Sequence, residues 1–221
     1  MDENLAAAQA IAYADELGVL YAREREQRKA VEDSLARLAG SYRTTVRALA
    51  ATLEPAFTLL VGAEVVILRD GSLDYSDELL GQLDVVVASV HASHRLSEAD
   101  QTKRVCAAME NPHVHILGHP TGRLIGRRRP NPLDMEAVVA KAVETGTALE
   151  ASCQPHRLDL SDTHVHLAVE AGALIAIDTD AHSVAALDYL PFGVMNARRG
   201  WTGPAAVVNT RPWPELRALL K

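Results

Sequence analysis

The sequence predicts an α/β protein in which a parallel sheet alternates with helices and follows a long amphipathic helix. Two observations predict this fold. After residue 56, five short apolar runs recur with helix-type segments between them. Nearly continuous apolar runs are typical of strands buried on both faces of a parallel sheet. Before Pro55, the chain instead has helical periodicity and no proline. We therefore predict two regions, residues 1–55 and residues 56–221.

The composition narrows the class of protein. The 221 residues carry a net charge of −7, with 48% hydrophobic and 23% charged residues, as in folded globular proteins. A negative charge argues against coating nucleic acid by bulk charge. No apolar run approaches the ~18–20 residues that span a bilayer, and the start lacks a signal-peptide pattern. Cys106 and Cys153 are too few for a disulfide framework. We expect a cytoplasmic protein without a membrane partner.

The first region has the pattern of a long amphipathic helix. Its apolar residues recur mostly at spacings of three and four, as on one helix face. They are Leu17, Leu20, Val31, Leu35, Leu38, Tyr42, Val46, Leu49 and Leu53. A helix of about 50 residues would be roughly 75 Å long at 1.5 Å per residue, so it needs a partner. A coiled-coil homodimer through residues 4–54, a hairpin broken near Gly40 and a helix packed loosely on the second region remain open.

The second region contains five strand and helix units. We expect the strands within 59–68, 83–91, 114–119, 147–153 and 173–182. One helix begins at Ser97, with Asp100 three residues on as in a capping box. Two others end at Gly146 and Gly172, and a last short helix begins at Pro214. A complete eight-fold barrel needs ~250 residues. The sequence therefore predicts an open sheet or an incomplete β/α barrel.

Metal-ligand residues recur near the carboxyl ends of the predicted strands. Glu64 lies within the first strand, and His91 and His119 end the second and third. Asp180 and His182 end the fifth. Because the carboxyl ends of parallel strands meet at one edge, we expect these groups to converge. Such a set can hold Zn²⁺ or Mn²⁺ and lower the pKa of bound water. The alternative is that they only hydrogen-bond the turn backbones.

Several motifs together resemble a known family. They are GAEVVILRDGSLDY, ASVH, ENPHVHILGHPTGRL, RLDLSD, IDTDAH, LDYLPFGV and NARRGW. In order and spacing they resemble the polymerase and histidinol phosphatase (PHP) domain, in the form found at the C-terminus of bacterial family X DNA polymerases. The resemblance covers residues 60–221. It implies a distorted seven-fold β/α barrel with metal-dependent phosphoesterase activity, in those polymerases a manganese-dependent 3′–5′ exonuclease that also removes phosphate from DNA ends.

The resemblance also assigns roles to residues. Glu64 matches the bridging carboxylate of the family, and His91 and His119 match two ligands of one metal. Asp180 and His182 match the TDAH motif, so Glu64 and Asp180 are the candidate catalytic carboxylates. The HxH and TDH motifs that open the family domain are missing, because no histidine precedes His91. We therefore expect a complete site only at Glu64, His91 and His119, in a barrel without its first strand–helix units.

Two further features concern residues outside this set. His113 and His115 have HxH spacing, but they begin the strand that His119 ends. They should therefore lie at the opposite edge, as structural or surface histidines. Glu150 lies in the fourth strand, where we expect it to form a buried salt bridge.

Arginines follow the third strand. Arg123, Arg127 and Arg128 lie in the segment TGRLIGRRRP, which has no acidic residue. Beside a metal, these arginines could hold the phosphates of a DNA backbone, with Arg199 as a second contact. The other interpretation is a solvated basic loop.

Two functions follow from the sequence. The first is a PHP-type phosphoesterase acting on phosphodiesters or phosphomonoesters of DNA ends. The second is an inactive PHP remnant that acts as a dimerisation or interaction module. The helical region resembles the linker helix that precedes HD-GYP domains of bacterial signalling proteins, although the HD and GYP motifs are absent. This combination suggests a truncated, recombined or engineered fusion.

Overall fold

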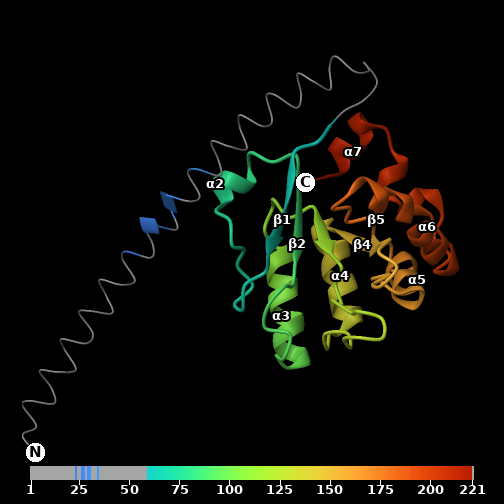
Figure 1. The fold of residues 1–221 in the computed structure, drawn as a ribbon, viewed down its shortest axis with the longest axis horizontal. Helices are drawn as coiled ribbons and strands as arrows, with labels where there is room; N and C mark the ends of the chain where they lie inside the picture. The colour runs from blue at the N-terminus through green and yellow to red at the C-terminus, as the bar shows by residue number, and fades with distance from the viewer. Residues whose placement is uncertain (1–22, 24–25, 28, 31–33, 35–58, 221) are drawn as a thin grey trace, which may run out of the picture. The chain divides into compact units, whose positions relative to one another are not determined.

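The computed structural model describes residues 59–220 and, further upstream, residues 23, 26–27, 29–30 and 34. Those upstream residues are helical and exposed. The rest of the predicted helix over 4–54, its dimerisation and the boundary near residue 55 lie outside the described residues. Contacts divide the chain into the units Met1–Leu59 and Leu60–Lys221. The second unit carries the sheet and its helices (Figure 1).

A five-stranded parallel sheet forms the centre of the second unit, as predicted. The strands are β1 (Gly62–Val66), β2 (Val85–Ser89), β3 (Ile116–Gly118), β4 (Ala148–Ser152) and β5 (Ile175–Asp178). They lie side by side in chain order, each paired with the next. In this register Glu64 lies beside Val87, and Val87 lies beside Ile116. The α/β class is therefore confirmed, as a partial barrel-like sheet.

Helices connect the strands and cover the sheet. They are α2 (Asp77–Leu80), α3 (Glu98–Met109), α4 (Met135–Thr145), α5 (Asp162–Glu170), α6 (Leu190–Arg199) and α7 (Trp213–Leu219). Three 3₁₀ turns complete the set: η1 (Val184–Tyr189), η2 (Pro204–Ala206) and η3 (Val208–Thr210). Helix α3 packs on α4, α4 on α5 and α5 on α6 (Figure 1). Among the described helices, none combines the length and the hydrophobicity needed to cross a membrane.

The predicted helix ends act through the expected side chains. The Oγ of Ser97 accepts a hydrogen bond from the backbone N–H of Asp100 at 3.1 Å and so caps α3. Helix α4 ends at Gly146, whose φ of 70° is the left-handed conformation that favours glycine. The last helix begins at Trp213 and carries Pro214 in its first turn. Local chemistry therefore determines where these helices begin and end.

Aliphatic side chains fix the sheet in place. Each strand contributes at least one side chain that is completely or almost completely buried: Val65, Val86, Leu117, Leu149 and Ile175. They belong to one core cluster with buried residues of the helices, such as Val105, Val138 and Val165. Burying an aliphatic side chain of this size is worth about 1.5–3 kcal/mol. The sheet is thus a firm support for the polar residues at the carboxyl ends of its strands.

Candidate metal centre

Three neighbouring strands bring one carboxylate and two imidazoles together. Glu64 lies in β1, His91 follows β2 and His119 follows β3 directly. The Oε1 of Glu64 is 2.9 Å from the Nε2 of His119 and 3.2 Å from the Nε2 of His91. One ligand atom from each residue lies within 4.8 Å of the others. The two imidazole rings are 5.3 Å apart between centroids. This spacing suits three ligands of one metal ion.

The three side chains differ in their access to solvent. The His119 side chain is 3% exposed, whereas those of Glu64 and His91 are 33% and 39% exposed. The hydrogen bond from the His119 ring, opposed by partial burial, lowers the pKa of Glu64 to about 2. The carboxylate is therefore charged at neutral pH. The site combines a buried anchor with an open side where water or a substrate can reach.

The donor set fits a catalytic rather than a structural metal. Two imidazole nitrogens and one carboxylate oxygen are the ligands that Zn²⁺ and Mn²⁺ accept, and three protein ligands leave positions for water. The Nδ1 atom of His119 is buried without a hydrogen-bond partner among the described residues. The orphaned nitrogen shows that the ring is not held by a conventional pair of hydrogen bonds. The residues present therefore fit a metal ion.

The His119 backbone has an uncommon conformation. Its φ of 25° lies in the left-handed region, which non-glycine residues adopt mainly when the surroundings impose it. The preceding Gly118 lies between two strands with no room for a side chain. A Cβ there would be 2.3 Å from the Oγ of Ser89 and 2.7 Å from the Cγ1 of Val87. Close strand packing at Gly118 thus fixes the backbone position from which the side chain of His119 extends.

The predicted salt bridge of Glu150 is wrong. Its buried carboxyl group accepts a hydrogen bond from the backbone N–H of His119 and hydrogen-bonds the carboxyl group of Asp178. Burial, with the charge of Asp178 as a further cause, raises the pKa of Glu150 well above its usual value. Burial also raises the pKa of Asp178. No described cation pairs with either carboxyl group. Sequence reasoning missed Asp178, although its place in the IDTDAH motif is a signal.

Asp180 and His182 lie outside the group of three ligands. Asp180 follows β5 with a φ of 45°, and its backbone N–H donates to the Oδ1 of Asp178 at 3.2 Å. The His182 side chain is 83% exposed, and its Nδ1 is 2.8 Å from the backbone oxygen of Asp180. Within the described part of the chain, Glu64, His91 and His119 form the one group with metal-ligand spacing. Ligand roles for Asp180 and His182 stay predictions.

The candidate phosphate-binding arginines have different surroundings. Arg123 and Arg128 donate hydrogen bonds to backbone carbonyl groups of their own and a neighbouring loop. Arg199 forms an ion pair with Asp162 at 2.9 Å. Arg127 is exposed, and its guanidinium group has no hydrogen bond or ion pair to the described residues, although its backbone N–H donates to the carbonyl oxygen of Leu124. Of the four candidate arginines, Arg127 therefore has the guanidinium group that is most available to an anion.

The HxH-like pair lies at the other end of the sheet. The Nδ1 of the buried His115 accepts a hydrogen bond from the backbone N–H of Val86 at 2.9 Å. His113 lies near Gly81, at the end of α2. Both histidines precede β3, whereas His119 follows it. Their structural role agrees with the expectation from the sequence.

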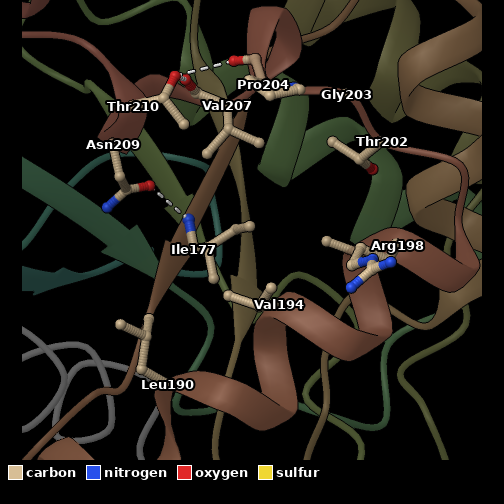
Figure 2. A pocket seen from close by; sticks show the side chains of 11 residues that line it. Ile177, Leu190, Val194, Arg198, Thr202, Gly203, Pro204, Val207, Asn209 and Thr210 are labelled. Carbon is tan, nitrogen blue, oxygen red and sulfur yellow. Dashed lines mark hydrogen bonds between the residues drawn. The ribbon is translucent and has the colours of Figure 1, made fainter.

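An apolar pocket of about 500 Å³ lies apart from the metal centre. Figure 2 shows its lining by Ile177, α6 and the segment that contains η2 and η3. Because side chains alternate along a strand, Ile177 and Asp178 point to opposite faces of β5. None of the lining residues is Asp, Glu, His or Cys. The pocket is therefore not an extension of the ligand group around Glu64.

Comparisons with known proteins agree with the motifs. The chain is 44% identical over 165 residues to the DNA polymerase/3′-5′ exonuclease PolX of Bacillus subtilis, a match that covers 75% of this chain and 29% of that protein. It is 41% identical over 92 residues to a probable phosphatase of Syntrophotalea carbinolica, with 40% of this chain and 36% of the relative covered. A probable phosphatase of Thermoanaerobacter pseudethanolicus is 33% identical over 134 residues, 56% of this chain and 52% of the relative.

The match spans 29% of the length of PolX, 36% of the Syntrophotalea relative and 52% of the Thermoanaerobacter relative, so the chain covers only part of each. No family model matches it. The similarity to PolX extends over most of the chain at 44% identity, and the relatives named as phosphatases match the same region in part. The chain is therefore a homologue of PolX and of these probable phosphatases, which confirms its resemblance to the PHP domain of bacterial family X DNA polymerases.

Proposed function

We propose that residues 60–220 form a metal-dependent phosphoesterase of the PHP type. The observation that carries this proposal is the convergence of Glu64, His91 and His119 from three strands, with ligand atoms within 4.8 Å of one another. The names of the relatives, PolX and probable phosphatase, supply the reaction class.

The residues of the site have distinct tasks in this proposal. His119, His91 and Glu64 hold the ion, and the low pKa of Glu64 keeps it negatively charged. A Mn²⁺ or Zn²⁺ ion held by these residues would supply a water of lowered pKa and would polarise the phosphoryl oxygen. The exposed sides of Glu64 and His91 leave a path for the ester. Arg127 is available to pair with a phosphate oxygen.

The finer proposal concerns the substrate. We take DNA 3′ ends as the preferred esters, because PolX carries a 3′-5′ exonuclease in its name and the match to it covers most of this chain. Asp180 is the second candidate catalytic carboxylate. It follows β5, which is the neighbour of the strand β4 that contains Glu150. Arg123, Arg128 and Arg199 would have to exchange contacts within the protein for phosphate contacts, so Arg127 is the arginine that we expect to matter most.

Hydrolysis of three phosphate compounds tests the function. The purified chain is incubated with Mn²⁺ or Zn²⁺ and bis(p-nitrophenyl) phosphate, p-nitrophenyl phosphate or a 5′-labelled single-stranded oligonucleotide. We expect metal-dependent hydrolysis that His119→Ala abolishes and that His113→Ala, at the far end of β3, leaves unchanged. Shortening of the oligonucleotide from its 3′ end would support the finer proposal. A metal-loaded wild-type chain that hydrolyses none of the three would disprove the phosphoesterase.

The second candidate is a catalytically inactive remnant that mediates dimerisation or another interaction. One observation favours it: Asp180 and His182 lie outside the ligand group, so a site with several metals lacks partners within the described residues. The proposed contact is the helical region, residues 4–54, as a homodimer. Metal binding without hydrolysis, together with a dimer in sedimentation equilibrium, would favour this function over the first.

A further inference from the structure

We propose that Glu150 and Asp178 form a carboxyl bridge, a pair of positioning residues that holds the metal ligand His119 in its binding conformation. The bridge joins the ends of β3 and β5 through β4, which lies between them. The inference deepens the proposed function, because it assumes that His119 binds the metal. It assigns a purpose to one buried and one partly buried acidic side chain, neither of which has a part in the ligand group itself.

The bridge is a continuous chain of hydrogen bonds. The backbone N–H of His119 donates to the Oε2 of Glu150, whose carboxyl group hydrogen-bonds that of Asp178. The Oδ1 of Asp178 accepts from the backbone N–H of Asp180 at 3.2 Å. Two loops that follow different strands are thereby connected through side chains. A shift of either loop would therefore change the lengths of these hydrogen bonds.

Both backbone donors belong to residues in left-handed conformations. His119 has a φ of 25° and Asp180 a φ of 45°. A non-glycine residue stays in this region only where surrounding contacts compensate for the strain. A carboxyl oxygen that accepts the N–H of such a residue provides a contact of this kind. The two carboxyl oxygens of the bridge thus accept hydrogen bonds from the two residues whose backbone conformations require such contacts.

Burial makes the bridge costly to break. Glu150 is 3% exposed, and no described cation pairs with it. Removing one member leaves a buried N–H or carboxyl group without a partner. Replacing a side chain that only filled space would leave no polar group without a partner.

The packing leaves a defined space for this side chain. A Cβ on Gly118 would lie 3.3 Å from the Oε2 of Glu150 and 2.3 Å from the Oγ of Ser89. The bare backbone at Gly118 therefore lets the carboxyl group of Glu150 reach the N–H of His119. Glycine and glutamate act together here, from neighbouring strands β3 and β4.

Three variants separate a positioning role from a space-filling role. In Glu150→Gln, the amide oxygen can accept from His119 and the amide nitrogen can donate to Asp178, so both hydrogen bonds persist. Glu150→Leu keeps most of the volume but offers no polar atom. Glu170→Leu, on the exposed end of α5, is the matched control.

The first measurement is Mn²⁺ affinity of the full chain, by isothermal titration calorimetry without substrate. Losing an outer partner of a metal ligand typically weakens binding about 10–100-fold. We expect Glu150→Leu to bind Mn²⁺ at least about tenfold more weakly, with Glu150→Gln and Glu170→Leu close to wild type. Unchanged affinity in Glu150→Leu would overturn the proposal. Equal losses in Glu150→Gln and Glu150→Leu would also overturn it, because only the leucine variant lacks both hydrogen bonds.

The second measurement does not depend on the metal or on a folded leucine variant. Hydrogen exchange followed by NMR reports whether the His119 amide is held by an acceptor. We expect strong protection of this amide in wild type and in Glu150→Gln. Rapid exchange in the wild-type protein would disprove the bridge even if no metal binds. Failure of the phosphoesterase assay, by contrast, would leave both measurements intact, so the two proposals fail separately.

Discussion

The Nε2 atom of His119 lies 2.9 Å from the Oε1 atom of Glu64, although their strands, β3 and β1, are separated by β2. The contact exists because His119 follows the end of β3, whereas Glu64 projects from within β1. The interaction lowers the pKa of Glu64 to about 2. A charged oxygen next to imidazole nitrogens strongly attracts a divalent cation.

Replacing the charge of Glu64 should weaken metal binding. Glu64→Gln keeps the size of the side chain but removes the negative oxygen that faces both histidines. We expect the affinity for Mn²⁺ to fall about tenfold or more, since the outer contacts of a metal site alone contribute about that much. Titration calorimetry measures this affinity, with a change at the exposed Glu136 of α4, Glu136→Gln, as the control. Equal affinities for the two variants would exclude Glu64 as a ligand.

The number of metal ions bound should be one for each chain. The described residues contain a single group with ligand spacing, and the exposed His182 lies outside it. We therefore expect His182→Ala to keep the wild-type metal content and His91→Ala to lose it. Metal analysis by mass spectrometry after gel filtration gives the ratio directly. A second ion that disappears in His182→Ala would show that the TDAH segment binds metal after all.

His115 should contribute to stability but not to metal binding. Its Nδ1 accepts a hydrogen bond from the backbone N–H of Val86, and both residues are buried. Losing the acceptor for a buried donor costs about 1–3 kcal/mol. Urea unfolding of His115→Ala should show a destabilisation of this size, while Mn²⁺ affinity stays at the wild-type value. A marked loss of metal affinity would instead indicate that the HxH-like pair binds the ion.

Gly118 should tolerate no side chain. In Gly118→Ala the new Cβ would overlap the Oγ of Ser89 at 2.3 Å and the Cγ1 of Val87 at 2.7 Å, so β2 and β3 must separate. Overpacking of this kind costs about 1–3 kcal/mol. We expect lower stability in urea and weaker metal binding together, because His119 is the next residue. Gly203→Ala, which meets no atom within 4 Å, is the control and should behave as wild type.

The thiol of Cys153 should be unreactive in the folded protein. Burial, with the charge of Asp178 as a further cause, raises the pKa of Cys153 to about 12. A raised pKa means that the thiolate forms only as the pH approaches that value, so at pH 8 the thiol stays protonated. Since the thiolate is the nucleophile, iodoacetamide should label Cys153 only after unfolding in urea. Peptide mass spectrometry identifies the labelled site. Rapid labelling at pH 8 without urea would contradict this prediction.

Much of the fold could be predicted from local sequence. The runs around Val65, Val86 and Leu117 are apolar enough to require burial on both sides, and helix ends at Ser97 and Gly146 follow from side-chain chemistry. The rule that the carboxyl ends of parallel strands meet at one edge also predicted that Glu64, His91 and His119 would lie together. That rule works because parallel strands end at a common edge, whatever their exact register.

The remaining features depend on distances between strands, which periodicity does not reveal. Glu150 pairs with Asp178 only because β4 and β5 align with Ser152 beside Asp178. A salt bridge was the better expectation for an isolated buried carboxylate, since the sequence does not show which neighbour faces it. The contacts of Arg123 and Arg128 with carbonyl groups depend on loop conformations, for which no periodic pattern exists.

The strand order β1-β2-β3-β4-β5 follows the chain without any exchange of neighbours. Every strand pairing therefore closes a single crossover connection, and the entropy lost in each closure stays close to the minimum that a parallel sheet allows. Assembly can advance one unit at a time, in the direction in which a ribosome releases the polypeptide. Nascent intermediates would then already contain the earlier part of the finished sheet.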